Sequence, residues 1–267
     1  MDVETINRLS LVPPPLHLRE KREIAPSNSI AVSSFGDVLI ISEMGEIVLV
    51  PIRPAASSSS TANASSHLEL PFENKSDREL IKDCEFTNIS FNRDNSAVLL
   101  WSPTSIGVIE IPRSLMLNGS IDPCCKKGKK CTFFDFSKHL SLGKNPNSTK
   151  LLKVLCHPWS SHHIVALQQH GPLTVIDIVN RTVQAISLNS RYNFTSFCFG
   201  PDVDWMAVSV LLVTDTADIF AVCPVLPRGC PVAVKNVNAM KDWLEEQERY
   251  HIFNSSSVNR PFLIYFV

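Results

Sequence analysis

The sequence predicts an all-β fold, a divergent, WD40-like β-propeller that is incomplete at about four to five blades and carries one short helix near its C-terminus. Three observations predict it. Apolar residues come in short runs rich in Val, Ile and Phe with turn residues between them, which favours strands over helices. Three sets of these runs resemble one another. Two of the sets, measured from Cys156 to Phe199, lie 43 residues apart, inside the blade period of about 40–45 residues.

The expected strands fall into four sets, and each set reads as antiparallel strands joined by short turns. Glu43-Met44-Gly45 is the expected tight turn of the first set. The strands expected in the four sets are, in order, Ile30–Ser33, Val38–Ile41 and Glu46–Ile52; Phe86–Phe91, Ala97–Trp101 and Gly107–Ile111; Leu151–Cys156, His163–Leu167, Leu173–Val179 and Thr182–Leu188; Phe194–Phe199, Trp205–Val213 and Asp218–Val222.

The last three sets share an order of features: a strand, a polar or Gly-Pro corner, a second strand, a short turn and a third strand. Pro158 and Pro201 stand at two of the corners, where a residue that cannot donate to a ladder ends the strand. This order is the meander of a propeller blade. A non-repeating β-sandwich is the alternative that the pattern leaves open.

Two polar segments interrupt the strands and define the expected domain organisation. Residues 1–23 are expected to form an N-terminal arm, and 24–233 the blades, with disordered insertions at about 53–82 and 113–150. Residues 234–267 are expected to form a helix and the terminal strand of a truncated next blade. Asn238 is the expected helix cap. Met240, Trp243, Leu244 and Gln247 are expected on one face, with Lys241, Asp242, Glu245, Glu246 and Glu248 facing away.

Composition excludes several classes of function. The net charge is -1, whereas a chain-wide nucleic-acid surface is basic, so we expect no direct nucleic-acid binding. The chain has 9 Gly and 18 Pro, and so few glycines argue against a phosphate-cradling nucleotide enzyme. The sequence shows neither a secretory signal nor an apolar run long enough to insert into a membrane. We therefore expect reduced cysteines, with Cys156, Cys198 and Cys223 buried as small hydrophobes.

Motif searches give no catalytic, cofactor-binding or metal-binding residues, and the expected cofactor content is none. Ser160, Ser161, His162 and His163 adjoin one another, but adjacent residues point in different directions, so a plain turn is expected rather than a triad. Cys124, Cys125, Cys131 and His139 are four potential zinc ligands, yet they contain no C-x₂-C pair and are interleaved with lysines. Lys126, Lys127, Lys129 and Lys130 form either a solvated loop tip or a small basic patch for an acidic partner or an import signal.

Three ordered stretches resemble the nucleoporin 88 family, whose fungal counterpart is nucleoporin 82. The first runs from Ile89-Ser-Phe-Asn92 through Ala97-Val-Leu-Leu-Trp101 to the third strand Gly107-Val-Ile-Glu-Ile-Pro-Arg113. The second runs from Leu151–Pro158 to Leu173–Ile178, and the third from the corner Phe197-Cys-Phe-Gly-Pro201 to Asp218-Ile-Phe220. The order and spacing agree across roughly residues 85–225, and Phe35–Ile52 fits an opening blade.

The resemblance implies an N-terminal propeller of a non-enzymatic scaffold at the cytoplasmic face of the nuclear pore complex. Its implied partners are other nucleoporins of that subcomplex, and its implied roles are mRNA export, ribosomal-subunit export and protein import. The chain departs from the family because it has no heptad region, so we expect a fragment or a truncated gene product. Partner-binding residues are not assigned: sheet edges, blade loops and the Trp243 helix are the alternatives. Another propeller adaptor, in a vesicle coat or a ubiquitin ligase, is the competing interpretation, and a propeller hydrolase with a central polar site is the third.

Overall fold

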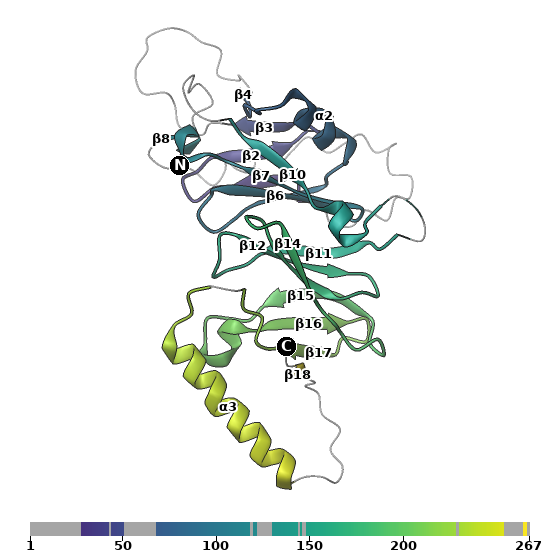
Figure 1. The fold of residues 1–267 in the computed structure, drawn as a ribbon, viewed down its shortest axis with the longest axis vertical. Helices are drawn as coiled ribbons and strands as arrows, with labels where there is room; N and C mark the ends of the chain where they lie inside the picture. Colours follow the sequence, from purple (N-terminus) through teal and green to yellow (C-terminus); the bar gives the residue numbers. More distant parts are fainter. Residues whose placement is uncertain are drawn as a thin grey trace, which may run out of the picture.

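The computed structural model describes residues 28–42, 44–50, 68–117, 120–121, 130–143, 145, 148–227, 230–253 and 264–265. They form an all-β, incomplete propeller of four four-stranded sheets, which we call blades 1 to 4 (Figure 1). Blade 1 holds β1 (Ile30–Val32), β2 (Val38–Ile41), β3 (Ile47–Val50) and β4 (Leu68–Glu69). Blade 2 holds β5 (Asn88–Phe91), β6 (Ala97–Ser102), β7 (Ser105–Glu110) and β10 (Thr132–Asp135). Blade 3 holds β11 (Leu151–Cys156), β12 (His163–Gln168), β13 (Leu173–Asp177) and β14 (Thr182–Ile186). Blade 4 holds β15 (Phe194–Phe199), β16 (Val210–Thr214), β17 (Ile219–Val222) and β18 (Ile264–Tyr265).

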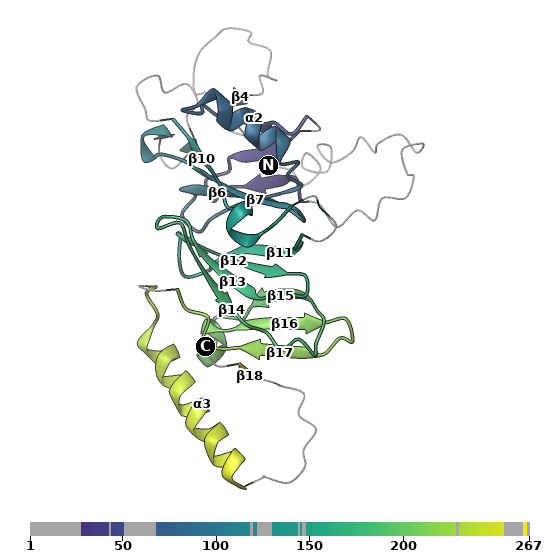
Figure 2. The same cartoon turned by 45° about the vertical axis from the view of Figure 1, so that its right-hand side comes forward.

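The blades follow one another along the long axis of the molecule, from blade 1 at the top to blade 4 at the bottom (Figures 1 and 2). At two of the blade boundaries the first strands contact each other, since β1 contacts β5 and β11 contacts β15. Among the described residues, no strand of blade 1 pairs with a strand of blade 4. The predicted incomplete propeller is therefore confirmed, with four blades that form an open arc.

An apolar layer separates each blade from the next, because successive apolar residues of a strand point to opposite faces of the sheet and so contribute to the layers on both sides. Leu39 and Leu49 of blade 1 share a core with Ile89 and Leu100 of blade 2. Blade 2 packs on blade 3 through a second core. Blade 3 packs on blade 4 through a third, where Phe197 and Phe220 are buried. The meander order β11-β12-β13-β14 of blade 3 is the order that the sequence predicted.

The expectation of two wholly disordered insertions was wrong. The first interruption contains β4 and the helix α2 (Lys75–Asp83), which buries Ile81 in the first core. The second contains the 3₁₀ turns η2 (Arg113–Leu115) and η3 (Ser137–Leu140), the hairpin β8 (Met116–Leu117) and β9 (Ser120–Ile121), and β10. β10 pairs with β7 and completes blade 2, so the interruption supplies that blade's outer strand. Residues 53–67 and 122–129 lie outside the described residues.

Three boundaries near the C-terminus also differ from the prediction. The expected strand Trp205–Val213 begins as the 3₁₀ turn η4 (Asp204–Val208), and β16 follows it. Helix α3 spans Val234–Phe253, so it begins one turn before the expected cap Asn238. The terminal strand belongs to blade 4 rather than to a next blade, because β18 pairs in parallel with β17 and satisfies an otherwise open sheet edge. No described helix is long and apolar enough to cross a membrane.

Side-chain hydrogen bonds join the blades at their strand corners. Asn95 Nδ2 donates to Ser34 Oγ (2.6 Å) between blades 1 and 2. Asn92 Nδ2 donates to the Ser161 carbonyl oxygen (2.7 Å) between blades 2 and 3. The Trp159 indole Nε1 donates to the Ala207 carbonyl oxygen (2.7 Å) between blades 3 and 4. Each boundary thus has a polar link beside its apolar layer, which fixes the position of one blade against the next.

Replacing Asn92 with alanine is expected to lower the free energy of unfolding by about 2–3 kcal/mol. Asn92 is 6% exposed, and its Oδ1 also accepts the Ala97 amide (3.0 Å). The change therefore removes the bonds to the buried Ala97 amide and to the half-buried Ser161 carbonyl oxygen. Urea denaturation measures the loss. Asn180→Ala is the matched control, because Asn180 is exposed and bonds only within its own turn among the contacts described, and we expect a loss below about 1 kcal/mol. Equal losses in the two variants would show that the inter-blade bond contributes nothing.

Candidate docking surfaces

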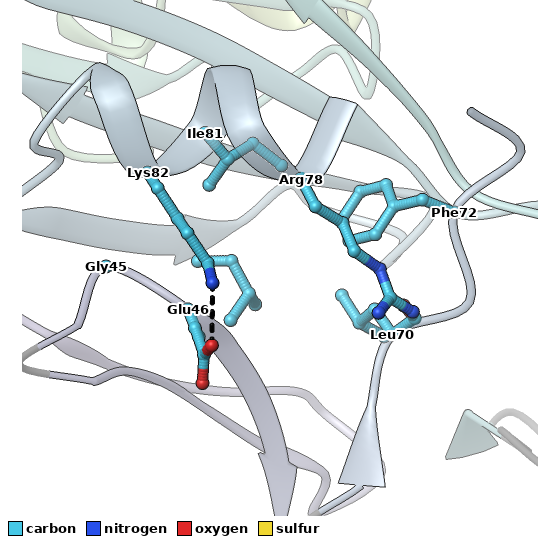
Figure 3. Close-up of a pocket in the computed structure, with 8 residues that line it drawn as sticks. Gly45, Glu46, Leu70, Phe72, Arg78, Ile81 and Lys82 are labelled. Carbon is cyan, nitrogen blue, oxygen red and sulfur yellow. Dashed lines mark hydrogen bonds and ion pairs between the residues drawn. The ribbon is translucent and has the colours of Figure 1, made fainter. Parts of the chain in front are cut away.

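A small pocket lies between helix α2 and strand β3 at the outer edge of blade 1 (Figure 3). The α2 side chains Arg78, Ile81 and Lys82 face Glu46 and Leu70 across it. Lys82 Nζ and Glu46 Oε1 form an ion pair of 2.8 Å, and Arg78 Nη2 donates to the Leu70 carbonyl oxygen (3.4 Å). The pocket measures about 60 Å³, well below the roughly 300–1,000 Å³ of small-molecule sites. It has room for one side chain of a partner.

A wider groove of about 480 Å³ continues from this pocket over the outer face of α2. Lys75, Arg78 and Lys82 line it together with Phe72 and Lys130. Two backbone hydrogen bonds hold the neighbouring residue Cys131 beside the groove. The Cys131 amide donates to the Pro71 carbonyl oxygen (2.8 Å), and the Cys131 carbonyl oxygen accepts the Glu73 amide (2.9 Å). These bonds place Lys130 at the groove. Glu73 and Glu79 also line the groove, so its charge is mixed. Of the predicted lysine patch, Lys130 is exposed here, while Lys126, Lys127 and Lys129 lie outside the described residues.

A second groove, of about 320 Å³, runs between blades 2 and 3. Arg113 of blade 2 and Arg181 of blade 3 line it with the aromatic ring of Phe134. The Arg181 guanidinium carbon lies 4.2 Å from the centroid of that ring, a cation–π contact that crosses the blade boundary. Arg181 has φ of 55°, a left-handed conformation that is uncommon for a residue with a side chain.

The structure brings together two of the four adjacent Ser and His residues. Ser160 Oγ lies 2.8 Å from His163 Nδ1, and His163 Nε2 lies 3.6 Å from Asp177 Oδ2. The four residues lie in and directly after the turn between β11 and β12, as the plain-turn interpretation expected, and this turn brings residues three apart into contact. His162 is exposed. Burial lowers the pKa of His163, against the opposing charge of Asp177.

This Ser-His-Asp group braces the strand corner. Asp177 Oδ1 accepts the amides of Val179 (3.0 Å) and Asn180 (2.9 Å) in its own turn. Ser160 Oγ also accepts the His162 amide (3.2 Å). The 3.6 Å separation of His163 and Asp177 exceeds a hydrogen-bond distance, and a triad requires the carboxylate to orient the imidazole directly. The hydrogen bonds of the group hold the turns together.

His157 is the buried histidine of the same corner. It is 1% exposed, its Nδ1 accepts the Trp159 amide (3.2 Å), and its Nε2 lies 3.2 Å from the Val225 carbonyl oxygen. This network assigns the proton to Nε2. Burial lowers the pKa of His157 to about 4, although the Val225 bond favours the protonated form.

Stability is expected to fall as the pH decreases from 6.5 towards 4. In that window the unfolded chain protonates His157, whose ordinary pKa is 6.5, while the folded chain keeps it neutral. Between pH 7.5 and pH 5, His157 alone accounts for a loss of roughly 2 kcal/mol. Urea denaturation at the two pH values measures it. His157→Gln, which keeps hydrogen-bonding groups without titrating, should show a loss smaller by that amount, and an unchanged pH dependence would contradict the assignment.

The burial of the three cysteines that were predicted to be buried differs from one to the next. Cys223 is buried, Cys156 is partly buried, and Cys198 is exposed. Cys198 was misplaced because Phe197 faces blade 3, which turns Cys198 to the opposite side of the sheet. Burial raises the pKa of Cys131 to about 12. Among the described residues no three His, Cys, Asp or Glu side chains lie close enough together to hold a metal ion. Two of the four potential zinc ligands, Cys124 and Cys125, lie outside the described residues.

Helix α3 packs against η4 at the end of blade 4. The rings of Trp205 and Trp243 stack with centroids 4.6 Å apart at 24°. Trp243 and Leu244 are partly buried, while Lys241 and Glu245 are exposed, so the predicted apolar face is confirmed for the described side chains. The side chains of Gln247 and Glu248 lie outside them. Val234 and Val237, near the start of the helix, are exposed and form a small apolar strip.

Trp243→Ala is expected to loosen α3 from blade 4. Stacked aromatic pairs contribute ~0.5–1.5 kcal/mol beyond their buried area, so the amides of α3 should exchange with solvent about tenfold faster. Hydrogen exchange followed by mass spectrometry measures this. Trp243→Phe keeps a stacking ring and is expected to retain most of the protection. Unchanged exchange in the alanine variant would mean that the stacked pair does not hold the helix.

No protein-family model matches the sequence, and no curated protein sequence matches it. Solved structures do match the fold. A chain of the Chaetomium thermophilum heterotrimeric Nup82 NTD–Nup159 TAIL–Nup145N APD complex superposes with a TM-score of 0.58 at 12% identity, covering 93% of this chain and 51% of that chain. A chain of the yeast heterotrimeric Nup82–Nup159–Nup116 nucleoporin complex gives a TM-score of 0.47 at 18% identity, covering 89% and 51%. The β-propeller domain of Myceliophteria thermophila Cps50 (Swd1) gives 0.43 at 10% identity, covering 79% and 56%.

The first of these likenesses establishes the architecture. The chain spans about half the length of the chain that it matches. At 12% identity the match identifies a fold. The incomplete propeller of this chain therefore has the fold of part of a chain in the Nup82 NTD–Nup159 TAIL–Nup145N APD complex.

Proposed function

We propose that this chain is a non-enzymatic nucleoporin propeller that serves as a docking platform for other nucleoporins. Its proposed place is the cytoplasmic face of the nuclear pore complex, where it supports mRNA export, ribosomal-subunit export and protein import. The observation that carries the proposal is the coincidence of two likenesses on the same strands. The ordered series over roughly 85–225 resembles the nucleoporin 88 family, and the fold match to a chain of a nucleoporin complex covers 93% of the chain.

The described surfaces support docking over catalysis. The α2 pocket is too small for a cofactor, and the two larger grooves are open and carry mixed charge. The Ser160–His163 pair is used in a turn. The arrangement suits a scaffold that presents rigid edges and grooves to partner proteins.

A fluorescently tagged chain is expected at the nuclear rim, and affinity purification from the same cells is expected to recover nucleoporins. Gly200→Val is the control, because a Cβ at Gly200 collides with the Met206 carbonyl oxygen and disrupts the corner before β16. That variant should lose both the rim signal and the co-purified proteins. A diffuse wild-type signal, without nucleoporins in the eluate, would refute the proposal.

The second candidate is a propeller adaptor of another assembly, since propellers of this shape serve many complexes. The sequence lacks the Trp-Asp and Gly-His signatures of ordinary repeats, and Asp204-Trp205 stands in the reverse order at the start of η4. An eluate dominated by vesicle-coat or ubiquitin-ligase subunits would favour this candidate over the nuclear pore.

A further inference from the structure

The groove over the outer face of α2 concentrates positive charge on a chain that is slightly negative overall. Four cationic side chains and two carboxylates line it, whereas the whole chain has a net charge of -1. The groove therefore carries an excess of two positive charges. The carboxylates are Glu73 and Glu79, and the cations are Lys75, Arg78, Lys82 and Lys130.

Helical spacing produces this concentration of charge. Lys75, Arg78 and Lys82 follow one another at intervals of three and four residues, and residues so spaced lie on one face of an α-helix. Asp77 and Asp83 of the same helix do not line the groove. Helix α2 has as many acidic as basic residues, yet it presents all of its cations and only one of its carboxylates to the groove.

The small pocket beneath α2 joins this groove, because Phe72 and Lys82 line both (Figure 3). Its walls are mainly apolar, since Ile47, Leu70 and Ile81 are buried and Phe72 is partly buried. An aliphatic side chain of a partner can enter the pocket, while the charged neighbours of that side chain remain in the groove. The combined surface thus suits a ligand that is anionic and has one apolar anchor.

The ion pair between Lys82 and Glu46 lies at the junction of the two hollows, since Lys82 lines both and Glu46 lines only the pocket. The two side chains are 45% and 38% exposed, and an ion pair this exposed contributes little to stability. A carboxylate of a partner can therefore replace Glu46 beside Lys82 Nζ at little cost to the fold. Until it does so, Glu46 neutralises one of the four cations.

The lining favours an acidic peptide over a nucleic acid. Glu73 and Glu79 stand among the cations, and they repel a phosphate backbone, which carries a negative charge at every nucleotide. Single strands also need exposed rings on which their bases stack, whereas Phe72, the one ring among the described residues of the lining, is partly buried. A peptide can place carboxylates opposite the cations and neutral residues opposite the two glutamates.

We propose that the groove over α2 binds an acidic segment of a partner protein, with one aliphatic side chain of that segment in the pocket. Carboxylates of the segment pair with Lys75 and Lys130 and replace Glu46 at Lys82. Charge complementarity of this kind accelerates association and selects among partners. The proposal depends on the groove alone and not on the assembly to which the chain belongs, so it stands or falls separately from the role at the nuclear pore.

Fluorescence anisotropy of the purified 267-residue chain with a short fluorescein-labelled peptide tests the proposal. The peptide has a central leucine flanked on both sides by aspartate and glutamate. We expect saturable binding that weakens about tenfold when NaCl is raised from about 50 mM to about 500 mM, because salt screens exposed charges. Serine in place of the leucine should weaken binding about tenfold, since the buried apolar area is lost. No saturation up to about 1 mM chain would overturn the proposal.

Charge reversal in the groove locates the site. Lys75→Glu and Lys130→Glu are each expected to weaken binding about fivefold, and both side chains are exposed, so the far-ultraviolet circular dichroism should stay that of the wild type. Lys150→Glu is the matched control, because Lys150 is exposed directly before β11 in blade 3 and the change in net charge is the same. Equal weakening by the control would show that net charge alone governs binding and would overturn the site.

Removal of the competing carboxylate tests the role of the ion pair. Glu46→Gln is expected to strengthen binding about threefold, because Lys82 then has no carboxylate to exchange. Asp202→Asn makes the same change in net charge at an exposed position before η4 and should leave the affinity unchanged. Equal affinities in the two variants would refute the replacement of Glu46. Single-stranded polyuridylate that binds as tightly as the peptide, and loses affinity in Lys75→Glu, would overturn the choice of a peptide.

Discussion

Sheet-on-sheet packing is the constraint on which the rest of the structure depends. An interior blade is stable when both of its faces are covered, so the strands of blades 2 and 3 carry apolar residues on both sides. This requirement explains the short Val- and Ile-rich runs and the dry layers between blades. It also explains why turns and corners carry most of the polar side chains that make specific contacts.

The corners convert this stack into a defined arc. Apolar layers alone permit neighbouring sheets to slide, because the hydrophobic effect has no direction. Asn95, Asn92 and Trp159 each place one short hydrogen bond across a boundary. Directional bonds at the three corners restrict the position of each blade against the next.

The sequence was sufficient for the repeated strands, because short apolar runs and the turn residues between them are local signals. It was insufficient for β10 and α2, since β10 has four residues beside a lysine-rich stretch and α2 buries one side chain, Ile81. Their order comes from tertiary contacts with β7 and the first core. The Ser160–His163 contact was missed because it depends on turn geometry, and the exposure of Cys198 depends on which face of β15 meets blade 3.

The segment between β7 and β10 leaves blade 2 and returns to it by way of blade 1. On the way out, the buried Ile121 amide donates to Asp37 of the β1–β2 turn (3.2 Å), and on the way back Cys131 is bonded to Pro71 and Glu73 beside β4. The segment that connects two strands of blade 2 is therefore hydrogen-bonded to blade 1 at two separate points. Blade 1 cannot open alone without breaking bonds that belong to blade 2, so the first two blades form a single cooperative unit of local unfolding.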